Sequence, residues 1–340
     1  MVSLKDIARA CRVSVATVSK ALNGQPDIGD RTRELVLRTA EEMGYLANSA
    51  ARALKTKRSY NIGVLFVDSR NSGLAHEYFA NVLDSVKVEA ERQGYDVTFI
   101  TSSIGSRPMT FLQHCRYRTM DGVVAACVDF KDPMVLELAA SDIPLVTIDH
   151  VIPGCPAVIS DNAFGEEALT RHAASFGHTK IAFIHGEEDD VTAERLAGFH
   201  RACGALGLDV PPEYILRSVY RDTQRTYDVT EKLLRLPEPP TCILFPDDFA
   251  CLGGYHAIRD AGLRIPEDIS ATGYDGAIIS RVIEPRLTTW RQDIATLGSL
   301  AATTLIHMIE RPDEDPAGTK TVPGMLIPGG SVAPVRPDAT

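Results

Sequence analysis

The sequence has 340 residues, 44% of them hydrophobic, and its 45 Asp and Glu against 35 Lys and Arg give a formal net charge of −10. This length can bury at least two sizeable cores, and with no run of about 18 apolar residues a membrane-spanning helix is excluded. The seven scattered cysteines form no Cys-x-x-Cys pair and no signal peptide precedes Lys5, so we expect a cytosolic protein with free thiols and without a metal or cofactor.

The charge is divided unevenly along the chain. Residues 1–60 carry 11 Lys and Arg against 6 Asp and Glu, whereas the remaining residues carry 24 against 39. A uniformly acidic chain would be repelled by nucleic acid. A basic N-terminal module on an acidic body instead favours a DNA-reading protein with a separate regulatory domain.

Three short helices are predicted in residues 1–46. Ser3, Ser14 and Asp30 are the expected N-caps, and the helices end near Arg12, Asn23-Gly24 and Gly44. The apolar residues that recur at helical spacing are Leu4, Ile7, Ala8 and Cys11 in the first, Val15, Val18 and Leu22 in the second, and Leu35, Val36, Thr39, Ala40 and Met43 in the third. Because only Arg12 and Val13 separate the first two, these must cross steeply, as in a helix-turn-helix unit. On pattern alone, an ordinary helical domain remains the alternative.

Several segments resemble the N-terminal signature of the lactose/galactose repressor family of bacterial transcription regulators. They are Leu4–Ala8, Val13–Ser19 and Leu22–Gly24, and the match continues through Gly44-Tyr45 and Asn48–Lys55 and on to about residue 330. The resemblance implies a DNA-binding regulator, which we expect to repress carbohydrate genes under the control of a small-molecule effector. One short helix reads too few base pairs, so we expect a homodimer on a pseudo-palindromic double-stranded operator.

The second helix is the expected reading element. Val15, Ala16 and Lys20 lie on its exposed start and middle, where the two apolar side chains would meet thymine methyl groups. The residues expected to contact DNA are Ser14, Val15, Ala16, Thr17, Ser19, Lys20, Asn23, Arg31, Leu54 and Lys55.

Residues 47–60 form the joint between the N-terminal module and the body. An Ala-rich segment this short is marginal as an isolated helix, so composition alone also allows a flexible linker. By resemblance it is a hinge helix that orders on the operator. Leu54 would then be the apolar wedge in the minor groove, and Lys55 a groove or phosphate contact.

From Asn61 onward strand-like and helical segments alternate, which predicts βαβ units and parallel sheets with both faces covered. The expected strands are 62–67, 97–101, 122–127, 145–148, 180–184, 242–245 and 270–273. These strands and helices are too many for a single sheet with its covering helices. We therefore expect an N-terminal all-α helix-turn-helix domain plus an α/β body of two doubly wound parallel-sheet lobes. The resemblance to periplasmic sugar-binding proteins implies three crossovers, with 61–161 and 291–320 in the first lobe and 162–290 and 321–335 in the second.

Ligands bind beyond the carboxyl ends of parallel strands, so the polar residues there are candidates for an effector site. For each carboxylate, capping the following helix is the alternative. Arg195 matches the family's ligand-gripping arginine, with a surface ion pair as its alternative; for Trp290 and the aromatic side chains, core packing is the alternative. The expected effector residues are Asp68, Tyr78, Phe79, Asp149, His150, Phe164, Arg195, Arg221, Asp247, Asp248, Asp275 and Trp290.

The effector chemistry follows from these side chains. Arg195 can fork onto hydroxyls, carboxylates accept hydroxyl hydrogens, and with an apolar wall they suit a sugar. Asp247 stands where many relatives have a neutral polar side chain, and Arg221 lies near a position that is often aromatic. A nucleobase or sugar-acid effector therefore remains the alternative.

Two other classes of protein are disfavoured. An α/β enzyme would need a G-x-G-x-x-G, P-loop or G-x-S-x-G motif; none occurs, so no catalytic residue is expected. An exported solute-binding protein would lack the N-terminal helices and carry a signal peptide. The C-terminal residues 329–334 contain no leucine heptad, which favours a dimer over a tetramer.

Overall fold

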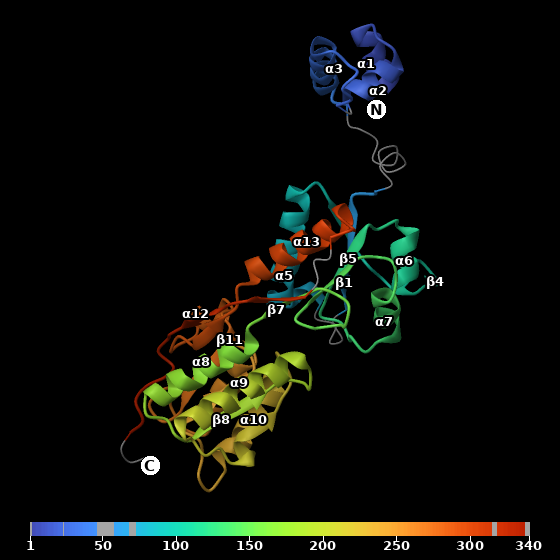
Figure 1. The fold of residues 1–340 in the computed structure, drawn as a ribbon. Helices are drawn as coiled ribbons and strands as arrows, with labels where there is room; N and C mark the ends of the chain where they lie inside the picture. Colours follow the sequence, from blue (N-terminus) through green and yellow to red (C-terminus); the bar gives the residue numbers. More distant parts are fainter. Residues whose placement is uncertain (1, 23, 46–57, 68–72, 315–317, 337–340) are drawn as a thin grey trace. The chain divides into compact units, whose positions relative to one another are not determined.

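The computed structural model describes residues 2–22, 24–45, 58–67, 73–314 and 318–336. The chain divides into two compact units, Met1–Ser59 and Tyr60–Thr340 (Figure 1). The first unit holds α1 (Leu4–Cys11), α2 (Val15–Leu22) and α3 (Asp30–Glu42). Ile7, Val18 and Val36 are fully buried where the three helices meet, so this unit has a core of its own.

Short-range hydrogen bonds define the helix starts. The Asp6 carboxylate accepts the backbone N–H of Ser3 at 2.9 Å, and Ser14 Oγ accepts the N–H of Thr17 at 3.0 Å. Both are N-cap arrangements that satisfy amide groups left open by the helix. The first two predicted caps are therefore in place.

The third helix differs from its prediction in two ways. Gly29 occupies the N-cap position, and Asp30 is the first helical residue, with its carboxylate 3.5 Å from Arg33. An acid in the first turn still complements the helix dipole there. Leu35 is exposed, because the buried stripe of α3 runs through Val36 and Ala40.

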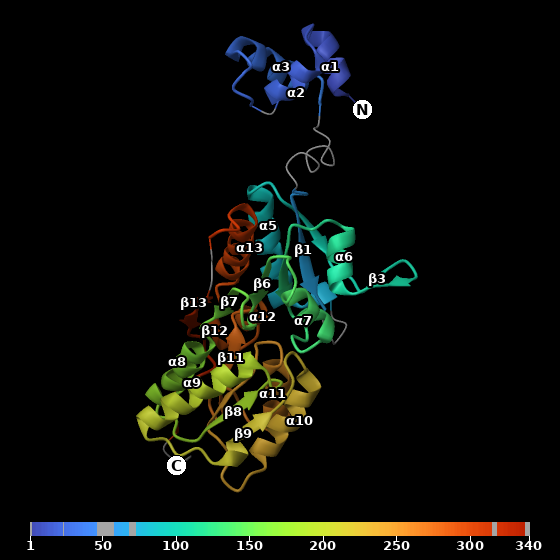
Figure 2. The same ribbon diagram turned by 45° about the vertical axis from the view of Figure 1, so that its right-hand side comes forward.

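The first lobe of the body is built on a six-stranded parallel sheet in the order β13-β7-β6-β5-β1-β2. Its strands are β1 (Asn61–Phe66), β2 (Asp96–Phe99), β5 (Gly122–Ala126), β6 (Leu145–Ile148), β7 (Ala157–Ser160) and β13 (Thr319–Val322). Helices α5 (Glu77–Arg92) and α13 (Ile294–Glu310) cover one face, and α6 (Phe111–Tyr117) and α7 (Pro133–Ala139) cover the other. The short hairpin of β3 (Ser103–Ile104) and β4 (Arg107–Pro108) projects beside α6, and η1 (Gly73–Ala75) precedes α5 (Figure 2).

The second lobe has the sheet order β14-β12-β11-β10-β8-β9, in which only β14 is antiparallel. Its strands are β8 (Ile181–His185), β9 (Ile215–Arg217), β10 (Cys242–Leu244), β11 (Ser270–Asp275), β12 (Thr288–Arg291) and β14 (Met325–Ile327). One face is covered by α8 (Asn162–Ser175) and α9 (Asp190–Leu206), the other by α10 (Thr223–Leu234) and α11 (Cys251–Asp260). The short helices η2 (Pro212–Tyr214) and α12 (Ile279–Val282) complete it.

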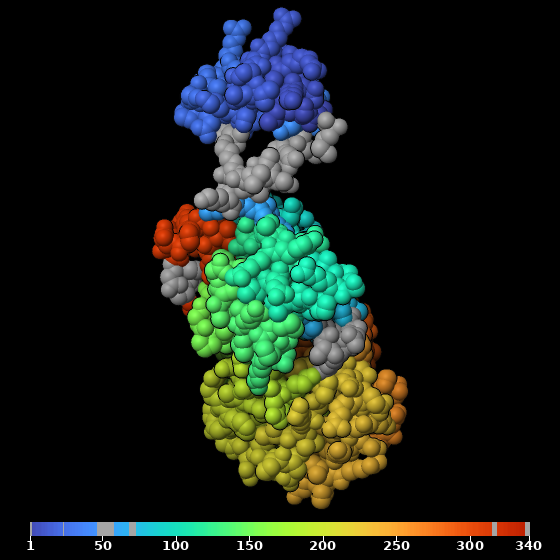
Figure 3. Space-filling view, turned by 90° about the vertical axis from the view of Figure 1, so that its right-hand side faces the viewer, coloured from blue at the N-terminus to red at the C-terminus, as the bar shows by residue number. Residues whose placement is uncertain are grey.

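Within the described residues, the chain passes between the lobes at three crossings: β7 to α8, β12 to α13, and β13 to β14. Val322 still pairs with Ser160 in the first sheet. The third crossing therefore lies beyond residue 322, whereas the resemblance placed it near 320. Figure 3 shows the surfaces of the two lobes, with the second in yellow.

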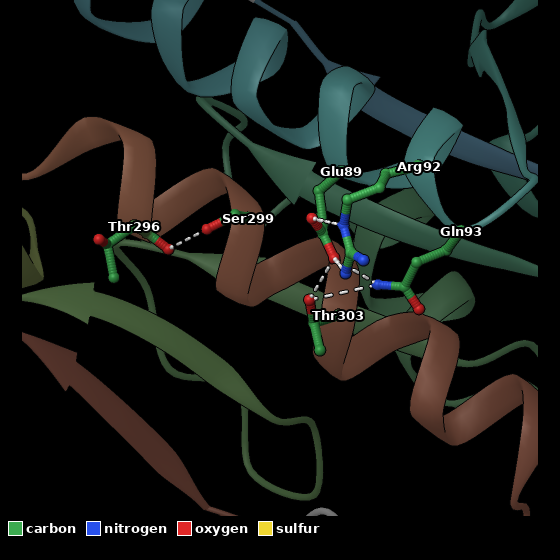
Figure 4. Close-up of polar contacts among 6 residues, drawn as sticks. All are labelled: Glu89, Arg92, Gln93, Thr296, Ser299 and Thr303. Atoms are coloured by element: carbon green, nitrogen blue, oxygen red, sulfur yellow. Dashed lines mark hydrogen bonds and ion pairs between the residues drawn. The ribbon is translucent and has the colours of Figure 1, made fainter.

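Helices α5 and α13 are tied together by a polar seam (Figure 4). The Glu89 carboxylate accepts hydrogen bonds from Arg92 at 2.6 Å, Gln93 at 2.6 Å and Thr303 at 3.0 Å. Hydrogen bonding to Arg92 is the main cause that lowers the pKa of Glu89 to about 2. The seam therefore keeps its charge at any ordinary pH.

Helices α8 and α9 pack at a distance that only glycine allows. A Cβ added at Gly198 would lie 2.0 Å from the carbonyl oxygen of Ala163, whereas one at Gly204, on the same helix, meets nothing within 4 Å. We expect Gly198→Ala to lower the free energy of unfolding by about 2–4 kcal/mol, because backbone must move. Gly204→Ala should instead raise it by about 0.5–1 kcal/mol. Urea unfolding of both variants checks this, and equal effects would contradict the packing.

Candidate functional site

A cleft of about 760 Å³ lies in the body and is lined by residues of both lobes. Eight predicted effector residues line it: Tyr78, Phe79, Asp149, His150, Arg195, Arg221, Asp247 and Asp275. The carboxyl ends of the central strands of both sheets face it, which explains why residues far apart in the sequence meet there.

The first lobe contributes a hydrogen-bonded acid. The Tyr78 hydroxyl donates to Asp149 Oδ2 at 2.5 Å, and Asp149 Oδ1 accepts the N–H of Ser160 at 3.2 Å. Burial raises the pKa of Asp149, and burial together with the neighbouring Asp149 raises the pKa of Tyr78 far above its usual value. The tyrosine therefore remains a donor that orients the carboxylate.

His150 bridges the two lobes. Its ring stacks on Phe130 with centroids 4.1 Å apart, and its Nδ1 lies 2.6 Å from a carboxylate oxygen of Asp190 at the start of α9. Phe130 also lines the cleft, so this stack forms part of the wall. The contact joins the two lobes within the lining of the cleft.

Arg195 is the central cation of the second lobe and is only 4% exposed, which excludes the surface ion pair. Its Nε donates to Asn162 at 2.9 Å, and its Nη1 donates to the Pro246 carbonyl at 2.8 Å. Its guanidinium lies 3.4 Å from the centroid of the Tyr274 ring. Within the described residues Nη2 has no hydrogen-bond acceptor, so the held side chain can present this nitrogen to a ligand.

Asp275 ends β11 and faces the cleft. Its Oδ1 accepts a hydrogen bond from Gln292 Nε2 at 2.7 Å. Burial is the main cause that raises the pKa of Asp275 to about 6, and Arg195 acts in the opposite direction. At neutral pH the group is largely an acceptor for ligand hydroxyls.

Asp247 mainly shapes the loop around it. Its Oδ2 accepts the N–H of Arg221 at 2.7 Å, and its Oδ1 accepts those of Phe249 and Ala250 at 2.9 and 2.7 Å. This is the backbone-capping role that the sequence left open. The Arg221 guanidinium lies 4.6 Å from the Phe249 ring centroid and donates to the Ala75 carbonyl of the first lobe at 3.3 Å.

Three predicted effector residues do not line the cleft. Asp248 turns inward and accepts hydrogen bonds from Thr289 at 2.6 Å and from the N–H of Ala277 at 2.7 Å. Trp290 is 2% exposed in the second-lobe core, and Phe164 is 52% exposed, with its ring edge-on to that of Trp290. These three side chains therefore lie outside the lining of the cleft. Asp68 lies outside the described residues.

Sequence reasoning missed several cleft residues: Phe130, Asn162, Asp189, Tyr220 and Gln292. Asn162 and Gln292 stand at the first two crossings between the lobes, which were predicted near 161–162 and 290–291, but no motif marks these two side chains as ligand contacts. Another signal exists only in the backbone. Four non-glycine lining residues have positive φ, namely Cys127, Asp149, Arg221 and Asp275. Such strained positions concentrate at functional sites.

The exposed side of α2 carries several of the predicted DNA-reading residues. Val15 is 41% exposed, and Ala16 and Lys20 are also exposed, as is Arg31 at the start of α3. Lys20 forms an ion pair with Asp27. Ser14 and Thr17 share a hydrogen bond of 2.8 Å between their hydroxyls, and Ser19 is partly buried. The predicted contacts Asn23, Leu54 and Lys55 lie outside the described residues.

No described helix combines the length and apolar character needed to cross a membrane. Among the described residues, no three His, Cys, Asp or Glu side chains gather as metal ligands. None of the seven cysteines, all of which lie among the described residues, forms a disulfide bond.

Comparison with known proteins accounts for both units. Residues 3–48 match the family model of the bacterial regulatory proteins of the lacI family, and residues 170–332 match a periplasmic binding protein-like domain. The ribose operon repressor of Haemophilus influenzae is 32% identical over 319 residues, which cover 93% of this chain and 94% of the relative. A crystal structure of the lac repressor dimer bound to operator and the anti-inducer ONPF superposes with a TM-score of 0.78 at 25% identity, covering 98% of this chain and 99% of that one. A regulator from Enterococcus faecium with bound ribose gives 0.69 at 25% identity, covering 81% and 100%. The chain therefore belongs to the lacI family of bacterial transcription regulators.

Proposed function

We propose that this protein is a homodimeric, cytoplasmic repressor without enzymatic activity, which binds a pseudo-palindromic operator and is controlled by a sugar held between its lobes. Residues 1–46 would read DNA, 47–60 would form the hinge, and the two lobes would bind the effector. The observation that carries the effector proposal is Arg195, fixed by three contacts with one nitrogen open, in a cleft that also contains Asp149 and Asp275.

The charge of the cleft supports a neutral, hydroxyl-rich effector. The lining holds two arginines and two histidines against a larger number of acids. The acids are Asp129, Asp149, Glu187, Asp189, Asp190, Asp222, Asp247 and Asp275. An anionic sugar acid would meet repulsion there, whereas hydroxyl groups find acceptors. The aromatic rings of Phe79, Phe130 and Tyr220 give the cleft apolar walls for a sugar ring.

A thermal-shift panel tests this assignment. It contains D-ribose, suggested by the ribose operon repressor and the ribose-bound regulator, together with D-galactose, cellobiose, galacturonate and hypoxanthine. We expect at least one neutral sugar to raise Tm, since a ligand that binds only the folded state stabilises it. If only galacturonate or hypoxanthine raises Tm, the effector is a sugar acid or a nucleobase and not a neutral sugar.

Operator reading is tested on α2. Exchanging Val15 and Ala16 for other small residues should change which half-site is preferred, because apolar side chains recognise thymine methyl groups. Arg31→Ala is the matched control, and it should weaken binding to all sequences alike if Arg31 contacts phosphate. Selections on randomised half-sites measure both. If the Val15 and Ala16 variants keep the parental half-site preference, other residues recognise the bases.

A further inference from the structure

Gln292 connects the two lobes through its side chain. It follows β12 at the second crossing and is 7% exposed. Its Nε2 donates to Asp275 Oδ1 at 2.7 Å, and its Oε1 accepts a hydrogen bond from Ser160 Oγ. Ser160 ends β7 at the first crossing. One amide therefore joins two crossings to a carboxylate of the cleft.

The surroundings permit one orientation of this amide. A primary amide offers donors on nitrogen and an acceptor on oxygen. The Asp275 carboxylate can only accept, so Nε2 of Gln292 faces it, and the Ser160 hydroxyl then donates to Oε1 on the other side. Tyr78 also lies 3.4 Å from Oε1, but its single proton goes to Asp149 at 2.5 Å. A reversed amide would place its carbonyl oxygen against the carboxylate.

This orientation fixes Asp275. Its backbone φ is +100°, which an aspartate adopts only when its surroundings hold it there. Within the described residues, Oδ1 accepts from Gln292 and Oδ2 has no hydrogen-bond donor, while the residue lines the cleft. We propose that Gln292 is a positioning residue of the effector site, which holds Asp275 toward the ligand and fastens it to the first crossing. The inference rests on the proposed function of the cleft.

Exchanging the two groups tests the contact without any ligand. Gln292→Glu sets two carboxylates against each other and should lower Tm by roughly 5 °C. Asp275→Asn keeps an acceptor for Gln292 and should change Tm less. In the double variant an asparagine amide donates to the new glutamate, so most of the loss should be recovered. If the Tm losses of the two single variants simply add in the double variant, the proposal is overturned. Gln113→Glu, at an exposed helix start, is the control for the added charge.

Positioning also predicts an effect on binding. Calorimetry with the first of D-ribose, D-galactose or cellobiose that binds the unaltered chain should show at least ten-fold weaker affinity for Gln292→Glu, at a temperature where the variant is folded. Unchanged affinity would overturn the positioning role. If none of the three sugars binds the unaltered chain, the proposed effector fails, whereas the exchange result still decides whether Gln292 and Asp275 are coupled.

Discussion

Arg195→Ala should abolish effector binding and also destabilise the body, the largest combined effect we expect from one substitution. The guanidinium supplies charge-assisted hydrogen bonds, which are the strong ones. Without it, Asn162 Oδ1 and the Pro246 carbonyl lose their donor, and the face of Tyr274 loses its cation. We expect at least a hundred-fold loss of sugar affinity and a loss of about 3 kcal/mol in the free energy of unfolding.

The control for Arg195→Ala is Arg201→Ala on the same helix. Arg201 is about half exposed and pairs with Glu167, so its removal should cost less than about 1 kcal/mol. Arg195→Lys adds a second comparison, because lysine keeps the charge but cannot stack and fork as a guanidinium does. Calorimetry and urea unfolding measure both quantities. If Arg195→Ala bound the sugar with normal affinity, Arg195 would not belong to the proposed effector site.

The second large effect concerns Glu166, a fully buried acid on α8. Its Oε1 has no hydrogen-bond partner among the described residues, and the same is true of the Tyr274 hydroxyl and Trp290 Nε1. Burial raises the pKa of Glu166 to about 8, although Arg195 acts in the opposite direction. Glu166 is therefore mostly protonated in the folded protein at neutral pH.

This raised pKa makes stability depend on pH. In the unfolded chain Glu166 loses its proton near its ordinary value of 4.5, whereas in the folded chain it keeps the proton to about 8. Between these values the folded state binds one more proton, so stability falls as pH rises, by about 1.4 kcal/mol per pH unit. The range from pH 6.5 to 8 lies above the pKa of about 6 for Asp275. Glu166 should contribute to the slope there, beside Asp248, whose pKa burial also raises well above its usual value.

Glu166→Gln should remove the Glu166 contribution to this slope, because a neutral amide occupies the same volume without titrating. Urea unfolding at pH 6.5, 7.25 and 8 measures it, and subtracting the two proteins cancels the contributions of Asp248 and the histidines. The fluorescence of Trp290, the single tryptophan, provides a local signal. If both proteins lose stability equally between pH 6.5 and 8, Glu166 is ionised throughout.

Most of the strands found from sequence are buried ones, and β2, at a sheet edge, is the exception. β1, β5, β6 and β10 read as continuous apolar runs, and the structure places each within one or two residues of its prediction. β12 was missed because Thr288 and Thr289 are polar by type yet fully buried, with hydroxyls bonded to Gly329 and Asp248. β13 and β14 lie at sheet edges, where the hydrophobic pattern is weak.

For the cleft, sequence located strand ends but not side-chain directions. Asp247 and Asp248 follow the same strand, and only the first lines the cleft, because the second accepts hydrogen bonds from a neighbouring strand and loop. Packing keeps Phe164 and Trp290 out of the cleft lining. This packing depends on contacts between segments more than a hundred residues apart, which a local pattern does not reveal. Gln292 had no motif, since its importance comes from the meeting of two crossings.

The three crossings also bear on how the chain is made. Residues 162–290 supply nearly all of the second lobe in one continuous segment, whereas the first lobe needs α13 and β13, which come after it. Leu297, Ala301 and Leu305 of α13 belong to the core that α5 covers. At about 5–20 residues per second, the ribosome needs roughly 8–30 s to travel from the first crossing to the end of α13. During that interval α13, which packs against α5 in the finished fold, has not yet been synthesised. The lobe synthesised first is therefore the one that closes its core last.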